Sequence, residues 1–143
     1  MGARSCLFLV SVLMIISLSS SVLGRQYKQL AAIHVTNSMP KGSGPMQISC
    51  KSSYTNYGMH QVDEGGEYQC GVRERAVYFC MALSGREMAS WHAFQPNRDG
   101  SRKAVYWLLK DDGIFLSWDN STWVRKSHLQ MYRQTSKVRY GIS

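Results

Sequence analysis

The sequence lacks the short motifs that mark common catalytic and metal centres. It has no GxSxG nucleophile turn, no HExxH zinc-binding pair and no glycine-rich phosphate loop. It also has no CxxC, and no cysteine and histidine at the spacing of a zinc ligand set. We therefore expect a protein that is not an enzyme and that holds no metal and no cofactor.

Histidines and carboxylates, the usual groups of acid–base chemistry, are scattered. The four histidines occur singly along the chain. A ribonuclease-like hydrolase would need the fold to bring two of them together, and His34 and His128 would then be the residues to replace. Asp111 and Asp112 are adjacent, so in a strand their side chains would face opposite sides, and Gly113 after them favours a turn. The sequence thus favours surface or half-buried roles for these groups.

Long apolar runs are absent except near the amino terminus, where one covers residues 6–18. Arg4 precedes this run, and short or small residues follow it. A membrane helix needs about 20 apolar residues, so the run is too short to be one and is typical of a secretory signal. We expect residues 1–24 to be removed by cleavage between Gly24 and Arg25.

Acidic residues are few in this chain. Against 9 Asp and Glu there are 17 Lys and Arg, which gives a formal net charge of +8. Residues 25–143 are enough for one secreted, extracellular domain, and a hydrophobic content of 44% is not that of a disordered chain. A basic exported protein is attracted to acidic cell-wall polymers or anionic membrane surfaces, whereas export makes nucleic acid a poor partner.

Cysteines are also few. Cys6 lies in the predicted signal, which leaves Cys50, Cys70 and Cys80 in an oxidising compartment. Three cysteines allow one disulfide and one free thiol, in three pairings. The free thiol would either be buried and inert or link to a second chain, so the sequence leaves the oligomeric state open.

What the chain has in abundance is a hydrophobic period of two. Apolar and polar residues alternate around residues 33–36, 46–51 and 67–72. Two runs, 76–83 and 104–109, are apolar throughout, which is typical of strands covered on both faces. Turn-forming residues separate the segments, and strands are predicted to begin near residues 32, 46, 67, 76, 91, 104, 113 and 122. This pattern predicts an all-β fold, a small antiparallel β-sandwich of seven to eight strands.

Two basic clusters are candidates for binding a partner. Arg73 and Arg75 lie at the tip of a predicted hairpin, and exposed loop tips on a rigid scaffold often carry recognition residues. Arg125 and Lys126 begin a basic C-terminal tail, because residues 120–143 contain five basic residues and no acidic one. Such a tail is attracted to an acidic partner.

One modification site is predicted. Asn120, Ser121 and Thr122 form an N-glycosylation sequon just after a predicted strand. Since the chain is predicted to be secreted, we expect Asn120 to carry a glycan, which would make the product a glycoprotein.

Five segments, taken in order, resemble one known family. They read HVTN, ISCKS, GGEY, VYFC and VYWLLKDDGI, and they are similar to the family's first strand and to its hCKS, GGxF, hFFC and CxWxhxxDGh motifs. This is the plant self-incompatibility S-protein family, and the resemblance runs from about residue 32 to residue 129. It implies a small secreted β-sandwich with a non-enzymatic role. The founding members are stigma proteins that act as ligands for a pollen membrane protein and trigger rejection of self pollen.

The chain departs from the family pattern at its cysteines. Val105 stands at one of two late cysteine positions, and Cys70 is an addition. The resemblance favours a Cys50–Cys80 disulfide, which closes a loop of about 30 residues and would contribute about 3–4 kcal/mol. Cys70–Cys80 is the alternative, open if a hairpin with a five-residue loop places these two residues opposite each other.

These observations together predict a secreted recognition or signalling ligand that binds a receptor or another membrane protein on a cell surface. Pollen self-incompatibility, or a related cell–cell signal, is the role that the resemblance implies. The alternative is a basic defence or toxin-like protein that acts on membranes or the cell wall. Binding that resists salt would favour the first, and activity that depends on the tail cations would favour the second.

Overall fold

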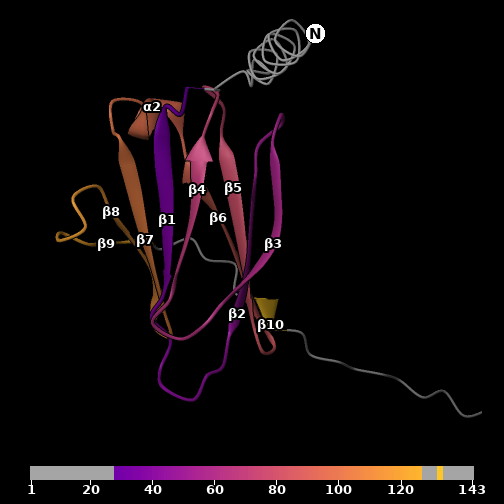
Figure 1. The fold of residues 1–143 in the computed structure, drawn as a ribbon. Coiled ribbons are helices and arrows are strands. Elements are labelled where there is room, and N and C mark those ends of the chain that lie inside the picture. Colours follow the sequence, from indigo (N-terminus) through magenta and orange to yellow (C-terminus); the bar gives the residue numbers. More distant parts are fainter. Residues whose placement is uncertain (1–27, 127–131, 134–143) are drawn as a thin grey trace, which may run out of the picture.

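Two five-stranded sheets pack face to face (Figure 1). The structure is a computed structural model of the chain, and it describes residues 28–126 and 132–133. Sheet A contains, in spatial order, β4 (Glu67–Val72), β1 (Ala31–Asn37), β7 (Ala104–Lys110), β8 (Gly113–Ser117) and β9 (Val124–Lys126). Sheet B contains, in spatial order, β10 (Tyr132–Arg133), β6 (Glu87–Phe94), β5 (Tyr78–Ser84), β2 (Met46–Lys51) and β3 (Asn56–Val62). A short helix, α2 (Pro96–Asp99), connects β6 to β7.

The predicted all-β sandwich is confirmed, with differences in strand number and direction. Eight strands have five or more residues, and the described part of the chain also contains the short strands β9 and β10. The sequence pattern does not reveal β3, because Val62 is its only buried residue. β1 and β7 pair in parallel, whereas the other pairs are antiparallel. Between β1 and β7 the chain forms most strands of sheet B. It then returns to sheet A and runs beside β1 in the same direction.

Residues at alternate strand positions point between the sheets and form the core. In β2, Met46, Ile48 and Cys50 are buried. Trp107 of β7 is only 1% exposed, and its indole N–H donates to the Ala93 carbonyl of β6 across the interior, at 2.9 Å. The alternation that the sequence predicted in β1, β2 and β4 is confirmed.

The two wholly apolar runs are covered on one face only, contrary to the prediction. In β5, Tyr78 and Cys80 are buried, but Phe79 between them is 46% exposed. In β7, Tyr106 and Leu108 are on the outer side and are only half-buried. The prediction was wrong because a two-layer sandwich has no third layer of structure. Each sheet therefore has an outer face, whatever the residues on that face.

The connection between β4 and β5, residues 73–77, crosses from sheet A to sheet B. The predicted hairpin is therefore wrong, since β4 pairs with β1 whereas β5 pairs with β2 and β6. The physical reason is burial, because Val72 at the end of β4 and Tyr78 at the start of β5 are both fully buried in the common core. The Arg73 N–H donates to the Tyr78 hydroxyl at 3.1 Å and fixes the crossing.

Cys50 and Cys80 form a disulfide within sheet B. They lie directly opposite each other on the neighbouring strands β2 and β5, and both are buried. Cys70 is a buried free thiol on β4, opposite Ile33 of β1 in sheet A. The pairing that the resemblance favours is thus the one present. Cys70–Cys80 is excluded because the hairpin that would have placed these residues opposite each other does not exist.

Several predictions concern residues outside the described part of the chain. They are the signal segment 1–24 with its cleavage site between Gly24 and Arg25, His128, and most of the basic tail. These remain predictions. Among the residues that the structure describes, no helix is both long enough and apolar enough to cross a membrane.

Candidate functional site

A basic corner, formed by Arg73 and Arg75, lies where the chain crosses between the sheets. The Arg73 guanidinium lies over the Tyr57 ring, 5.6 Å from its centroid, and both arginines are exposed. The Glu74 carboxylate between them turns back and accepts a hydrogen bond from the Ser52 hydroxyl. The corner therefore holds its one anionic side chain against the protein and presents two cations to solvent.

Tyr57 anchors this corner to both sheets. Its ring belongs to β3 of sheet B, and its hydroxyl donates a hydrogen bond to the Gly71 carbonyl on β4 of sheet A. Burial raises the pKa of Tyr57, so the hydroxyl stays protonated and keeps donating at neutral pH. The Arg73 guanidinium thus rests on a fixed aromatic platform, which reduces the entropy lost when it binds an anionic group.

Two further cations, Arg102 and Lys103, lie at the same end of the sandwich. The registers show why, because the start of β1 is flanked by the last residue of β4, Val72, and by the first of β7, Ala104. Arg73 follows Val72 and Lys103 precedes Ala104, two strand spacings or about 10 Å apart across the sheet. We call Arg73, Arg75, Arg102 and Lys103 the basic end. The sequence alone does not reveal the second pair, because only the sheet order places residues 102–103 beside residues 73–75.

Arg125 and Lys126 do not join the basic end. They belong to β9, at the opposite edge of sheet A from β4, and four strand spacings separate the two edges by about 19 Å. Arg125 donates to the Asp112 carbonyl and crosses over Gly113, where a Cβ would meet its Nε at 3.1 Å. Arg125 therefore clamps the β7–β8 turn. The four predicted partner-binding residues form two separate sites.

Asn120 lies in the turn between β8 and β9, with an exposed side chain and a φ of 59°. The neighbouring Asp119 carboxylate organises this turn by accepting hydrogen bonds from the Ser121 N–H at 2.9 Å and the Thr122 N–H at 2.7 Å. These N–H groups hold the pKa of Asp119 well below its usual range. The sequon is therefore presented on an ordered, accessible turn, and glycosylation at Asn120 remains a prediction.

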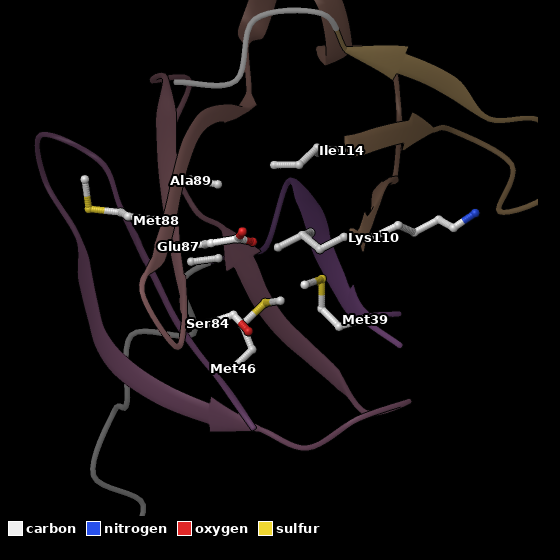
Figure 2. Close-up of a pocket in the computed structure, with 10 residues that line it drawn as sticks. Met39, Met46, Ser84, Glu87, Met88, Ala89, Lys110 and Ile114 are labelled. Atoms are coloured by element: carbon white, nitrogen blue, oxygen red, sulfur yellow. The ribbon is translucent and has the colours of Figure 1, made fainter. Parts of the chain in front are cut away.

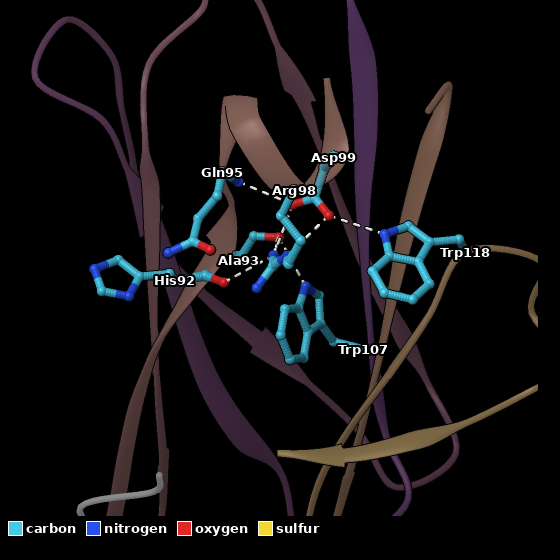
Figure 3. A network of polar contacts seen from close by, with 7 residues as sticks. All are labelled: His92, Ala93, Gln95, Arg98, Asp99, Trp107 and Trp118. Atoms are coloured by element: carbon cyan, nitrogen blue, oxygen red, sulfur yellow. Dashed lines mark hydrogen bonds and ion pairs between the residues drawn. The ribbon is translucent and has the colours of Figure 1, made fainter. Parts of the chain in front are cut away.

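A buried polar network closes the end of the sandwich next to α2 (Figure 3). The Asp99 carboxylate is fully buried and pairs with the Arg98 guanidinium at 2.7 Å. It also accepts from the Trp118 indole at 2.8 Å and from the Gln95 N–H at 2.9 Å. Both Asp99 oxygens accept hydrogen bonds and the carboxylate is closed to solvent, so it ties together the segments around β6, α2 and β8 and is not placed to transfer protons to a substrate.

The described histidines each pack against another aromatic residue, and His60 lies against Tyr68, with ring centroids 5.0 Å apart. His34 stacks on Tyr106 of sheet A, with ring centroids 4.7 Å apart, and pairs with the Glu67 carboxylate. His92 packs against Phe79 on sheet B, at 4.3 Å. His34 and His92 thus lie on different sheets, which does not support an acid–base pair between them. Among the described residues, no group of three or more His, Cys, Asp or Glu side chains could hold a metal ion.

A narrow crevice opens between the sheets at the end opposite the basic end (Figure 2). Met39, Met46, Ala89 and Ile114 give it an apolar lining. Its volume of about 40 Å³ holds a few water molecules, whereas sites for small organic ligands usually occupy 300 Å³ or more. The crevice is therefore a packing defect where the two sheets diverge, and it offers no ligand site of ordinary size.

Comparison with known proteins agrees with the sequence motifs and with the fold. A search of curated proteins finds no match. Among solved structures, the chain is similar to a plant SPH (self-incompatibility protein homologue) protein, from a family described as widespread, small, highly stable and secreted. The TM-score is 0.57 at 18% identity, over 67% of this chain and 90% of that one, which supports the fold. The family model for plant self-incompatibility protein S1 matches residues 32–135, most of the chain. The chain therefore belongs to the plant self-incompatibility protein S1 family.

Proposed function

We propose that this protein is a secreted, non-enzymatic recognition ligand that binds a membrane protein on a cell surface, in pollen self-incompatibility or a related cell–cell signal. The observation that carries the proposal is the family match over residues 32–135, which includes nearly all of the predicted mature chain. The basic end supports it, because four exposed cations on a fixed scaffold suit an acidic extracellular loop.

Binding to living cells tests this proposal. Labelled secreted protein is added to pollen tubes and to other plant cells, with unlabelled protein as competitor, across salt concentrations. We expect saturable binding to one cell type that persists at physiological ionic strength, where free charges are screened beyond about 8 Å. Binding that is unsaturable and vanishes at that ionic strength would overturn the proposal.

A pair of double variants tests whether the basic end takes part. Arg73→Ser with Lys103→Ser removes two cations from the basic end. Lys41→Ser with Lys110→Ser removes two exposed cations from the opposite end, where β1 and β7 finish, and is the matched control. We expect the first pair to weaken competition about tenfold and the second to change it less than about twofold. Equal losses would mean that net charge, and not the basic end, sets the affinity.

The alternative function, a basic defence or toxin-like protein, is supported by the net charge of +8 alone. It predicts leakage of dye from anionic vesicles and growth inhibition, and it predicts that both double variants lose activity equally. Lysis without saturable cell binding would favour this alternative over a recognition ligand.

A further inference from the structure

The outer face of sheet B carries an apolar stripe along its central strand. β5 turns Phe79, Met81 and Leu83 outward at alternate positions, and Phe79 is 46% exposed. Val77, which is 37% exposed, continues the row toward the basic end. We call these four residues the β5 stripe. A row of large, partly exposed apolar side chains on the middle strand of a sheet is typical of an interaction surface.

Methionines widen the stripe on both sides. The strand registers place Met59 of β3 in line with Met81, with Ser49 between them, and place Met88 of β6 beside Leu83. Met59 is itself 48% exposed. Because methionine is flexible and polarisable, a surface of this composition can adapt to the side chains of an apolar partner segment.

The far end of the stripe opens into a hollow of about 360 Å³. Leu83 and Met88 form its apolar wall, and the rest of its lining comes from Pro45, Gln47, Gly85, Arg86 and Glu87. This volume is at the lower end of the range of ordinary ligand sites, so side chains of a bound segment fit within it. A flat lipid surface would leave it empty, so its shape favours a protein segment over a membrane.

The charges around the stripe are basic, except for Glu87 at the hollow. Lys51 lies opposite Phe79 at one end, and Arg86 follows β5 at the other. Within the described residues neither forms an ion pair with a carboxylate, and the outward positions of β2, β3, β5 and β6 contain no acidic residue. Glu87 borders the hollow but also lines the crevice between the sheets, toward which β6 turns it (Figure 2).

We propose that the β5 stripe and its hollow bind an extended segment of a partner protein, apolar in its middle and with a carboxylate near each end. Phe79 and Leu83 are four residues or about 13 Å apart along β5, so the apolar part of that segment spans four to five residues. The inference rests on the proposed function for the identity of the cell-surface partner. The chemistry of the segment follows from the face itself, through apolar burial in the middle and charge complementarity at both ends.

Competition on cells tests the stripe with a matched pair of variants. Met81→Glu places a carboxylate in the middle of the stripe, and Leu108→Glu places one on the middle strand of sheet A, also outward and half-buried. We expect Met81→Glu to compete with labelled wild type at least about tenfold more weakly and Leu108→Glu within about twofold of wild type. Lys51→Glu, at an exposed position that does not threaten folding, is expected to weaken competition in the same direction.

A direct titration separates failure of this surface from failure of the proposed function. The folded, isotope-labelled secreted protein is titrated with the peptide Asp-Leu-Val-Phe-Val-Asp and, as control, with Lys-Leu-Val-Phe-Val-Lys. We expect the acidic peptide alone to shift amide signals of β5 and of the turn at Arg86, and Lys51→Glu to abolish the shifts.

Each outcome decides between the two proposals. Saturable cell binding that Met81→Glu leaves intact would overturn the docking surface and keep the recognition function. Absent cell binding with β5 shifts from the acidic peptide would overturn the recognition function and keep the surface. Equal shifts from both peptides would overturn the charge requirement, and binding to phosphatidylserine vesicles that Met81→Glu abolishes would replace the protein partner with a membrane.

Discussion

The outer faces of the two sheets differ in how far their side chains are satisfied by the protein itself. On sheet A, His34 stacks on Tyr106 and pairs with Glu67, and the Lys110 ammonium lies 5.5 Å from the centre of the Phe115 ring. Cations and aromatic rings on this face therefore already have partners within it. An apolar outer face therefore needs no partner protein when its rings and charges contact one another.

On the outer face of sheet B, Phe79 does pack against His92, with ring centroids 4.3 Å apart, but the large side chains of this face stay more exposed. Phe79 and Met59 are 46% and 48% exposed, and Lys51 and Arg86 have no ion pair within the described residues. The strands beneath this face are joined covalently by the disulfide between β2 and β5. A cross-link between these strands holds their register in a sheet whose outward side chains contribute little packing. Sheet B thus combines cross-linked strands with an outer face whose apolar and basic side chains remain exposed.

The largest expected effect on the free energy of unfolding comes from removing the disulfide of sheet B. Replacing both Cys50 and Cys80 by alanine should lower the free energy of unfolding by about 3–4 kcal/mol, because the bridge closes a long loop. Urea unfolding followed by tryptophan fluorescence measures this. Cys70→Ala is the control, expected to cost about 1 kcal/mol through lost apolar burial in sheet A. Equal losses in the two variants would contradict a special role for the bridge.

The next largest effect on the free energy of unfolding is expected from removing one aromatic residue on each outer face. Tyr106→Ala removes the ring that stacks on His34, and we expect it to lower the free energy of unfolding by about 2 kcal/mol. Phe79→Ala removes a ring that contacts His92 but is nearly half exposed, and we expect it to cost about 1 kcal/mol. Urea unfolding of both variants checks the order. A larger loss for Phe79→Ala would mean that sheet B's outer face is a stabilising surface.

A smaller effect concerns the free thiol of sheet A. Burial raises the pKa of Cys70 to about 11, so only about 0.1% is thiolate at pH 8. We expect the native protein to react with a thiol reagent such as DTNB far more slowly than the same protein in urea. Cys70→Ala should remove the slow reaction entirely. Rapid labelling of the native protein would show that the thiol is accessible, and would reopen the question of a link to a second chain.

The sequence could predict the features that depend on burial alone. Alternation located β1, β2 and β4, because their inward residues must be apolar. It could not locate β3, whose side chains are almost all exposed. It also could not separate β4 from β5, because nothing local to residues 73–77 says which sheet follows. The two sheets are distinguished by pairing between distant segments, and a single local pattern does not record that pairing.

The candidate site was predictable to a similar degree. Arg73 and Arg75 were singled out by charge, but Arg102 and Lys103 join them only through the order of strands in sheet A. The apolar runs indicated central strands, and β5 and β7 are the middle strands of their sheets, but the expected cover on both faces was wrong. Asp99 is part of a sequence that reads as a turn, so its role as a buried acceptor depends on Trp118 from a distant segment.

The smallest expected effect is local and lies at the edge of sheet A, where Asp119 caps the turn before β9. Because N–H donors lower the pKa of this carboxylate in the folded state, its contribution is fully present above the ordinary value of about 3.9 and is lost as pH falls further toward the folded value. We expect the Ser121 and Thr122 amides to stay protected from hydrogen exchange at pH 4 and to lose protection only in stronger acid. Asp119→Asn should show no such acid step. A carboxyl titration midpoint at or above 4 would contradict the cap, and with it the inference that sheet A satisfies its own charges out to its edge.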